Sequence, residues 1–165
     1  MKEKVEVQET KQLVIFKLGE EEFGVDILQV REIERLGQGV TRVPKSPAFV
    51  EGVINLRGEI VPIVDLRKRF ALAVKEIGSE ARIIIVEVND NQVGMIVDSV
   101  VEVIRINVSA IGIAPTITKG VETYYLSGVA KIDNRLIILL NLERALSAEE
   151  VKELDTVKAG MEAER

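Results

Sequence analysis

The sequence predicts a mainly β protein built from two small SH3-like barrels that are related by internal duplication. Three observations lead to this prediction. Short runs rich in β-branched residues alternate with polar turns along most of the chain. The first half aligns with the second half in the same order, which is uncommon without duplication. The 165 residues, of which 47% are hydrophobic, suit one domain or two very small ones with a real core.

The first predicted hairpin lies near the start of the chain. Residues 12–18 form a β-branched and aromatic run of strand length, and residues 22–27 resume as a strand after the polar turn 19–21. The segment 27–34 fits either a short helical turn or a twisted strand, because its apolar spacing does not decide between them. Two prolines then interrupt the chain, since neither can donate to a β-ladder.

A second predicted hairpin follows the prolines. Its strands are residues 49–56 and 60–64, and the turn is Arg57-Gly58, where the glycine supplies a positive φ. Asp65 can begin a brief helix through Phe70, because its carboxylate can accept hydrogen bonds from the free amides of the first turn.

The second half of the chain repeats this pattern. Residues 12–27 align without a gap on residues 82–97, and beyond an insertion around 114–119 the alignment resumes with Gly52 on Gly128. Glycine at both positions indicates a bulge or a close backbone approach. Each copy has about five short strands, and closing each sheet into a barrel would remove its exposed edges. Since each barrel alone would be marginally stable, we expect a core shared between them.

The chain ends in a predicted surface helix, because Ser147 and Glu150 form a capping box and only a thin apolar edge follows. The predicted parts are a first five-stranded barrel (12–80), a second (81–146), the C-terminal helix (147–157) and flexible ends (1–11 and 158–165).

Composition excludes many classes of function. The sequence has no Cys and no His, so it has no thiolate nucleophile, no usual zinc site and no Ser-His-Asp triad. We therefore predict no catalytic residues, no metal and no cofactor. The net charge of −5 disfavours nucleic acid and anionic membranes as partners. The longest apolar run, 136–140, is far too short to insert into a membrane, and the start has no signal core, so we expect a soluble cytoplasmic protein.

One motif resembles a known family. Residues 49–66, Phe-Val-Glu-Gly-Val-Ile-Asn-Leu-Arg-Gly-Glu-Ile-Val-Pro-Ile-Val-Asp-Leu, closely resemble the signature of the CheW family of bacterial chemotaxis coupling proteins. The similarity runs over residues 12–155, and further segments that share it are 12–16, 23–27, 44–49, 93–98 and 125–128.

The resemblance implies a function as well as a fold. Members have two five-stranded barrels and no catalytic activity. They are scaffold or adaptor proteins that couple chemoreceptors to the histidine kinase CheA in signal transduction. The implied partners are the regulatory domain of CheA and the cytoplasmic tip of methyl-accepting chemotaxis receptors, so the protein would be cytoplasmic and recruited to membrane-bound receptor arrays.

The resemblance also implies candidate binding residues. A groove between the barrels, floored with aliphatic residues, could bind a helix of the receptor tip. The implied kinase-facing residues are Ala81 and Arg82. The implied receptor-facing residues are Val30, Glu32, Ile33, Gly52, Arg57, Gly94, Val100 and Val103.

Several alternatives stay open from the sequence. The valines and isoleucines of the groove are also compatible with core positions, and Arg57 with a structural role. The chain could be a CheW-like module of another signalling scaffold that senses a ligand or a peptide in the cleft between its barrels. An enzyme with buried carboxylates at Asp26, Asp65 or Asp98 is less favoured, because aspartate is common at caps and turns.

Overall fold

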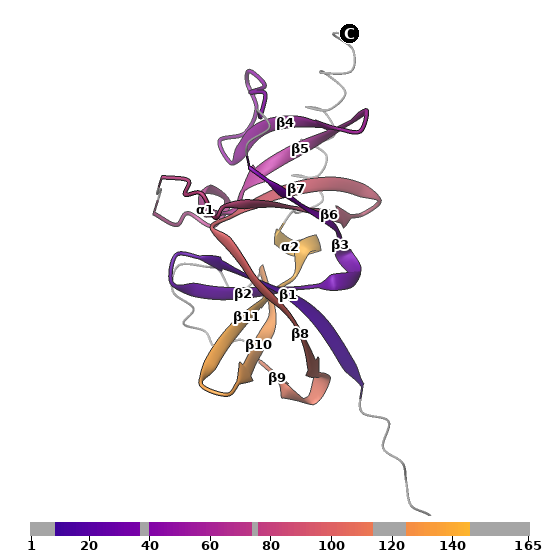
Figure 1. The fold of residues 1–165 in the computed structure, drawn as a ribbon, viewed down its shortest axis with the longest axis vertical. Helices are drawn as coiled ribbons and strands as arrows, with labels where there is room; N and C mark the ends of the chain where they lie inside the picture. The colour runs from indigo at the N-terminus through magenta and orange to yellow at the C-terminus, as the bar shows by residue number, and fades with distance from the viewer. Residues whose placement is uncertain (1–8, 37–39, 74–75, 114–124, 146–165) are drawn as a thin grey trace, which may run out of the picture.

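The structure, a computed structural model, describes residues 9–36, 40–73, 76–113 and 125–145. These residues form two β-sheets with a few short helices, and the prediction of a mainly β fold is confirmed. Figure 1 shows one sheet in the upper half of the molecule and the other in the lower half, with α2 where they meet. The helices are η1 (Ile27–Gln29), α1 (Leu66–Arg69), η2 (Val108–Ala110) and α2 (Leu142–Ala145).

The lower sheet, here called sheet A, has six strands in the order β8-β1-β2-β11-β10-β9. All its neighbouring strands are antiparallel except β2 and β11, which pair in parallel. Its strands are β1 (Thr10–Leu18), β2 (Glu21–Asp26), β8 (Ser99–Asn107), β9 (Ile111–Gly112), β10 (Leu126–Ile132) and β11 (Arg135–Leu140).

The upper sheet, here called sheet B, has five strands in the order β3-β6-β7-β5-β4. Again one pair, β5 with β7, is parallel and the others are antiparallel. Its strands are β3 (Val30–Arg35), β4 (Val50–Leu56), β5 (Glu59–Asp65), β6 (Arg82–Val88) and β7 (Asn91–Val97).

Each sheet takes strands from both copies of the repeat. The hairpin β1–β2 leaves its own copy to pair with β8 and β11, while β6–β7 pairs with β3 and β5. The predicted boundaries 12–80 and 81–146 therefore do not coincide with the sheets: sheet B is continuous from residue 30 to residue 97, and sheet A is assembled from the segments on either side. Four strand pairs join the two copies: the parallel pairs β2–β11 and β5–β7 and the antiparallel pairs β1–β8 and β3–β6.

The sequence led us to expect closed barrels, but neither sheet is closed. Within the described residues the ladders end at β8 and β9 in sheet A and at β3 and β4 in sheet B. Charged side chains, among them Arg31, Arg35 and Arg105, lie exposed on the edge strands β3 and β8. Charges of this kind protect an open edge against further strand pairing, so closure is not needed for that purpose.

The ends of the chain differ in part from the prediction. Strand β1 begins at Thr10, inside the segment 1–11 that was expected to be flexible. The predicted helix 147–157 and the end 158–165 lie outside the described residues.

The expected shared core is present. The largest apolar cluster takes buried side chains from both sheets, including Phe16 and Phe23 of sheet A and Ile84 and Met95 of sheet B. Smaller clusters lie on the other face of each sheet, because successive residues of a strand point to opposite faces. For example, Ile83 belongs to the outer cluster of sheet B although Ile84 belongs to the shared core.

The predicted local features are mostly confirmed. The segment after β2 forms η1 followed by strand β3, which combines the two readings that its spacing allowed. In the β4–β5 turn, Arg57 and Gly58 both have positive φ, at 49° and 89°. The register of the β4–β5 ladder shifts between Val50 and Gly52, as a bulge requires, and the β10–β11 ladder shifts at the equivalent Gly128.

Candidate functional site

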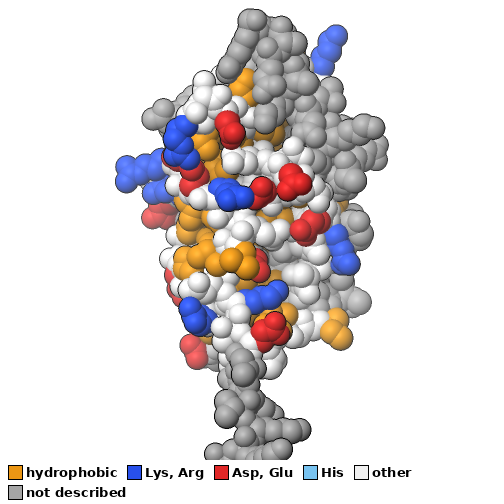
Figure 2. All heavy atoms as spheres, turned by 90° about the vertical axis from the view of Figure 1, so that its right-hand side faces the viewer, with side chains coloured by type: hydrophobic (Ala, Val, Ile, Leu, Met, Phe, Trp, Pro, Cys, Tyr) orange, Lys and Arg blue, Asp and Glu red, His pale blue; other side chains and the backbone are white. Residues whose placement is uncertain are grey.

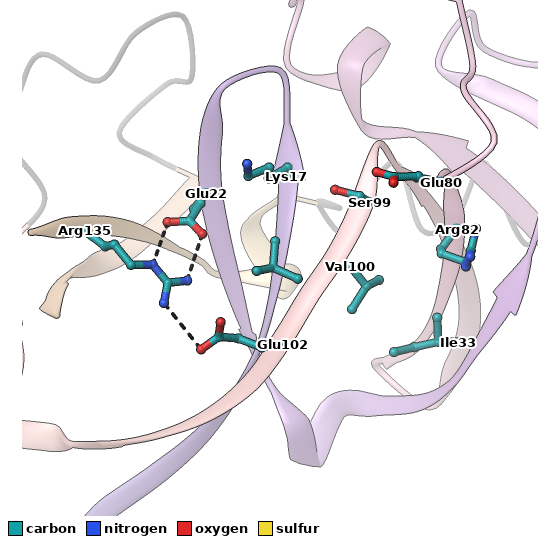
Figure 3. Close-up of a pocket in the computed structure, with 10 residues that line it drawn as sticks. Lys17, Glu22, Ile33, Glu80, Arg82, Ser99, Val100, Glu102 and Arg135 are labelled. Atoms are coloured by element: carbon teal, nitrogen blue, oxygen red, sulfur yellow. Dashed lines mark hydrogen bonds and ion pairs between the residues drawn. The ribbon is translucent and has the colours of Figure 1, made fainter. Parts of the chain in front are cut away.

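A cleft of about 620 Å³ lies between the two sheets. Figure 3 shows Ile33 of β3 and Val100 of β8 near one another across it, with Arg82 of β6 on the side of Ile33. Sheet A lines the opposite side. The lining residues are Lys17, Glu22, Ile33, Glu80, Arg82, Ser99, Val100, Val101, Glu102 and Arg135.

The apolar part of the cleft comes from the two edge strands. Ile33 is 40% exposed and Val101 is 38% exposed, although large aliphatic side chains usually avoid water. Val100 is half-buried and packs against the shared core. Charged residues outnumber aliphatic ones in the lining, so the cleft is more polar than the aliphatic floor that we expected.

An arginine and two glutamates form the charged wall on sheet A. Arg135 donates hydrogen bonds to both carboxylate oxygens of Glu22, from Nη2 at 2.8 Å and from Nε at 3.1 Å. Its Nη1 donates to Glu102 at 3.4 Å. The hydrogen bond from Arg135 lowers the pKa of Glu22, and it raises the pKa of Arg135 itself. Glu22 and Arg135 therefore stay ionised near neutral pH, and the hydrogen bonds of Arg135 link β2, β8 and β11.

A related pair links β3 to the β4–β5 turn in sheet B. Arg57 donates a hydrogen bond to Glu32, which the duplication aligns with Glu102 of sheet A. Hydrogen bonds with Glu34 and Arg57 lower the pKa of Glu32, and the same contact with Glu32 raises the pKa of Glu34. In both copies, an arginine of the neighbouring hairpin thus binds the equivalent strand glutamate.

The receptor-facing residues that the resemblance implied do not all meet in the cleft. Ile33 and Val100 line it, whereas Glu32, which pairs with Ile85 of the outer cluster, binds Arg57 on the other face of sheet B. Pseudo-equivalent positions behave alike: Val30 is half-buried against the shared core like Val100, whereas Val103 is 50% exposed and Ile33 is also exposed.

Two implied positions, both glycines, are not accessible. Gly52 is buried, and a Cβ placed on it would lie 2.1 Å from the carbonyl oxygen of Thr41. Gly94 is also buried, and a Cβ there would lie 2.5 Å from Ile63. Both positions require glycine because of close packing, and neither glycine is exposed as a contact surface.

The implied kinase-facing residues also differ from each other. Ala81 is 3% exposed and belongs to the core. Arg82 is half-buried, lines the cleft and donates from Nη1 to the carbonyl oxygens of Ser79 and Ala81. Sequence reasoning thus placed Arg82 apart from Ile33, yet the two residues line the same cleft.

Sequence reasoning missed the charged wall. Lys17, Glu22, Glu102 and Arg135 were not singled out, although the alignment of Glu102 with Glu32 was a usable signal. The alignment could not reveal the partner arginine, because Asp133 occupies the position equivalent to Arg57. The arginine of the second copy stands two residues further along, on the strand instead of the turn.

The three candidate catalytic carboxylates have structural partners. Asp26 accepts a hydrogen bond from the amide of Leu28 at the start of η1. Asp65 accepts from the amide of Arg67 at the start of α1. Asp98 accepts from the side chain of Arg67. Among the described residues no group of three His, Cys, Asp or Glu side chains could hold a metal ion.

These features define a class of protein: a two-sheet β protein with a mixed apolar and charged cleft between its sheets. Figure 2 shows hydrophobic side chains exposed in patches among acidic and basic ones on the right-hand face of Figure 1. No helix in the described part of the chain is long and apolar enough to cross a membrane.

Comparison with known proteins identifies the family. Residues 12–150 match the family described as "CheW-like domain", and the chain belongs to this family. It is 40% identical over 146 residues to "Chemotaxis protein CheW" of Klebsiella aerogenes, covering 88% of this chain and 87% of that protein. It is 34% identical over 143 residues to "Chemotaxis protein CheW" of Thermotoga maritima, covering 86% of this chain and 91% of that protein.

A solved structure agrees with the sequence relatives. The "scaffolding protein TtCheW from Thermoanaerobacter tengcongensis" has a TM-score of 0.79 and 37% identity, covering 91% of this chain and 96% of that one. The chain is therefore a member of a non-catalytic scaffold family of chemotaxis signalling.

Proposed function

We propose that this protein couples chemoreceptors to the histidine kinase CheA, by binding the receptor tip in the cleft between its two sheets. The observation that carries the proposal is the pair of aliphatic side chains, Ile33 and Val100, which lie across this cleft from each other. The family supports the partners, since the relatives named above are chemotaxis proteins.

A helix is the occupant that this geometry favours. An amphipathic helix could place its apolar stripe against Ile33 and Val100 and its polar edge against the charged wall of Glu22, Glu102 and Arg135. Exposed charges at the rim would contribute mostly to the association rate and to specificity, and the aliphatic contacts to affinity.

Ile33→Asp tests the binding surface. Ile33 is already 40% exposed, so aspartate should fold there, whereas a charge at the half-buried Val30 would disturb the shared core. Because it places a charge against the apolar stripe of the helix, Ile33→Asp should weaken binding of a receptor-tip fragment at least tenfold. The matched control is Ile113→Asp, since Ile113 is 96% exposed and does not line the cleft.

Binding of both partners is measured in one set of pull-down and calorimetry experiments, with a receptor-tip fragment and the CheA regulatory domain. Wild-type protein should bind both saturably. Equal receptor affinity of Ile33→Asp and Ile113→Asp would contradict the cleft assignment. Binding of neither partner by the wild type would instead favour the second candidate, a ligand- or peptide-sensing module of another signalling scaffold.

A charge exchange tests the role of Arg57. Arg57→Glu should repel Glu32 and reduce receptor coupling while preserving the melting temperature, because the arginine side chain is 73% exposed. The double variant Glu32→Arg with Arg57→Glu restores opposite charges. Recovery of coupling would mean that the pair positions β3, whereas continued loss would mean that Arg57 itself contacts the partner.

A further inference from the structure

A second cavity, of about 570 Å³, opens on the outer face of sheet B, away from the shared core. Its floor consists of the buried side chains Ile54, Ile83 and Ile96, which belong to the separate outer cluster of this sheet. Half-buried aliphatic residues form its walls, and Ile77, which is 52% exposed, also lines it. This combination of size and apolar lining is typical of a site for a small molecule.

Within the residues that the structure describes, the glutamates that line this cavity have side-chain partners, but the arginines do not. Glu51 is ion-paired with Lys68, and Glu34 is in contact with Glu32, which raises the pKa of Glu34. In contrast, Arg35 and Arg42 line the cavity with no hydrogen bond or ion pair to any other described residue. The free charge at the rim is therefore positive, which matches an anionic group on an occupant.

The duplication shows that the fold does not require this cavity. In sheet A the position equivalent to Glu34 is Ile104, and the position equivalent to Leu36 is Ile106. Both isoleucines pack with Leu13 and Ile137 in the outer cluster of that sheet. In sheet B the same space is bordered by Glu34 and Arg42, whereas Arg35 has a counterpart in Arg105 of sheet A. Sheet B therefore differs from its own copy in part of the residues that a ligand would meet.

We propose that the outer cavity of sheet B binds a medium-chain aliphatic carboxylate. Its hydrocarbon chain would lie against Ile54, Ile83 and Ile96, and its carboxylate would accept hydrogen bonds from Arg35 and Arg42. A guanidinium group matches a carboxylate in geometry as well as charge, which favours this anion over a neutral amphiphile. The cavity is concave and has one apolar floor and a charged rim, on which Arg35 and Arg42 outnumber Glu34 once Glu51 is paired with Lys68. This arrangement favours a small amphiphile over a protein surface.

The test uses two probes of equal chain length, octanoate and 1-octanol, with the full chain in titration calorimetry. Octanoate should bind saturably and more tightly than 1-octanol. The double variant Arg35→Gln with Arg42→Gln should weaken octanoate binding about tenfold and leave 1-octanol binding unchanged, because only the anion loses charge-assisted hydrogen bonds. Arg105→Gln is the matched control, since Arg105 holds the position in sheet A equivalent to Arg35.

A second variant tests the location independently of the arginines. Ile77→Asp places an anion beside the cavity and should abolish octanoate binding, whereas Ile113→Asp should not. The proposal is overturned if octanoate shows no saturable binding, if octanoate and 1-octanol bind equally, or if Ile77→Asp binds like the wild type. It is likewise overturned if an acidic aliphatic peptide binds much more tightly than octanoate and with the same dependence on Arg35 and Arg42.

Discussion

Replacing Gly52 by alanine should unfold the β4 edge of sheet B and cause a large loss of stability. Gly52 has a φ of 151°, a conformation that residues with a side chain rarely adopt. The segment beside it is joined to β4 by two hydrogen bonds: Thr41 N donates to Val53 O at 2.9 Å, and Val53 N donates to Thr41 O at 2.8 Å. The added Cβ would lie 2.1 Å from that same Thr41 oxygen.

The size of the effect follows from two costs, the backbone strain at residue 52 and the clash with Thr41. Forcing alanine into the conformation of Gly52 costs about 1–3 kcal/mol. Pushing Thr41 away breaks both hydrogen bonds of the bridge, at about 1 kcal/mol each. Gly52→Ala should therefore lower the free energy of unfolding by about 3–5 kcal/mol. For a chain of this length, that lowers the melting temperature by about 6–20 °C.

Gly58→Ala separates the two costs. Gly58 also has a positive φ, 89°, but a Cβ there would meet no atom within 4 Å. Its melting temperature should fall by only a few degrees, since it carries backbone strain without a clash. Both variants are compared with the wild type by calorimetric or circular dichroism melting. A melting temperature of Gly52→Ala within about 2 °C of the wild type would refute the argument and return Gly52 to the set of possible contact residues.

Three further predictions concern a pair of glycines that are equivalent in the two copies of the repeat, and the carboxylates Glu22 and Asp65. Gly94→Ala should lower the free energy of unfolding by about 1–3 kcal/mol, because its Cβ would lie 2.5 Å from an isoleucine. At the equivalent Gly24, an added Cβ would meet three side-chain atoms at 3.1 to 3.3 Å, so Gly24→Ala should cost less than Gly94→Ala; thermal melting that ranks them in the reverse order would contradict the packing argument. The pKa of Glu22 is lowered from its ordinary value of 4.5, so its ion pair with Arg135 stabilises the fold above that pH and ceases to do so as the pH falls. Melting of Glu22→Gln should thus fall below the wild type at pH 7, and the difference should shrink as the pH falls below 4.5; a constant difference would be evidence against the ion pair. Burial raises the pKa of Asp65, so its charge is costly; Asp65→Asn should be at least as stable as the wild type at pH 7, while Asp65→Ala, which cannot cap α1, should lose about 1 kcal/mol in denaturant unfolding.

The sequence was informative about elements and about their repetition, because both depend on local patterns. The turn at Arg57 and the bulge at Gly52 could be read from residue types whose backbone preferences are strong. The exchange of hairpins could not be predicted in this way. Hairpins β1–β2 and β6–β7 have equivalent apolar patterns, so the pattern of β5 fits β2 and β7 equally well as a parallel neighbour. Only the three-dimensional path of the chain decides between these pairings.

The site was partly predictable for a related reason. Alignment of the copies pointed to Glu32 and Glu102, but not to Arg135, since an arginine can reach the same carboxylate from several positions. Exposure was equally hidden: Ile33 and Val30 look alike in sequence, yet one is open to the cleft and the other packs on the shared core. Glycines cannot be assigned to packing or to binding until the neighbouring atoms are known, as Gly94 demonstrates.

The interleaved path of the chain constrains how the molecule is made. As the nascent polypeptide leaves the ribosome, β1–β2 emerges before the other strands, but Phe16 pairs with Val100 and Phe23 with Ile138, which are synthesised much later. The whole of sheet B can assemble in the meantime, because its strands are consecutive. The hairpin β1–β2 is therefore synthesised before sheet B yet completes its pairing after it, and until then it exposes apolar side chains that a chaperone could recognise.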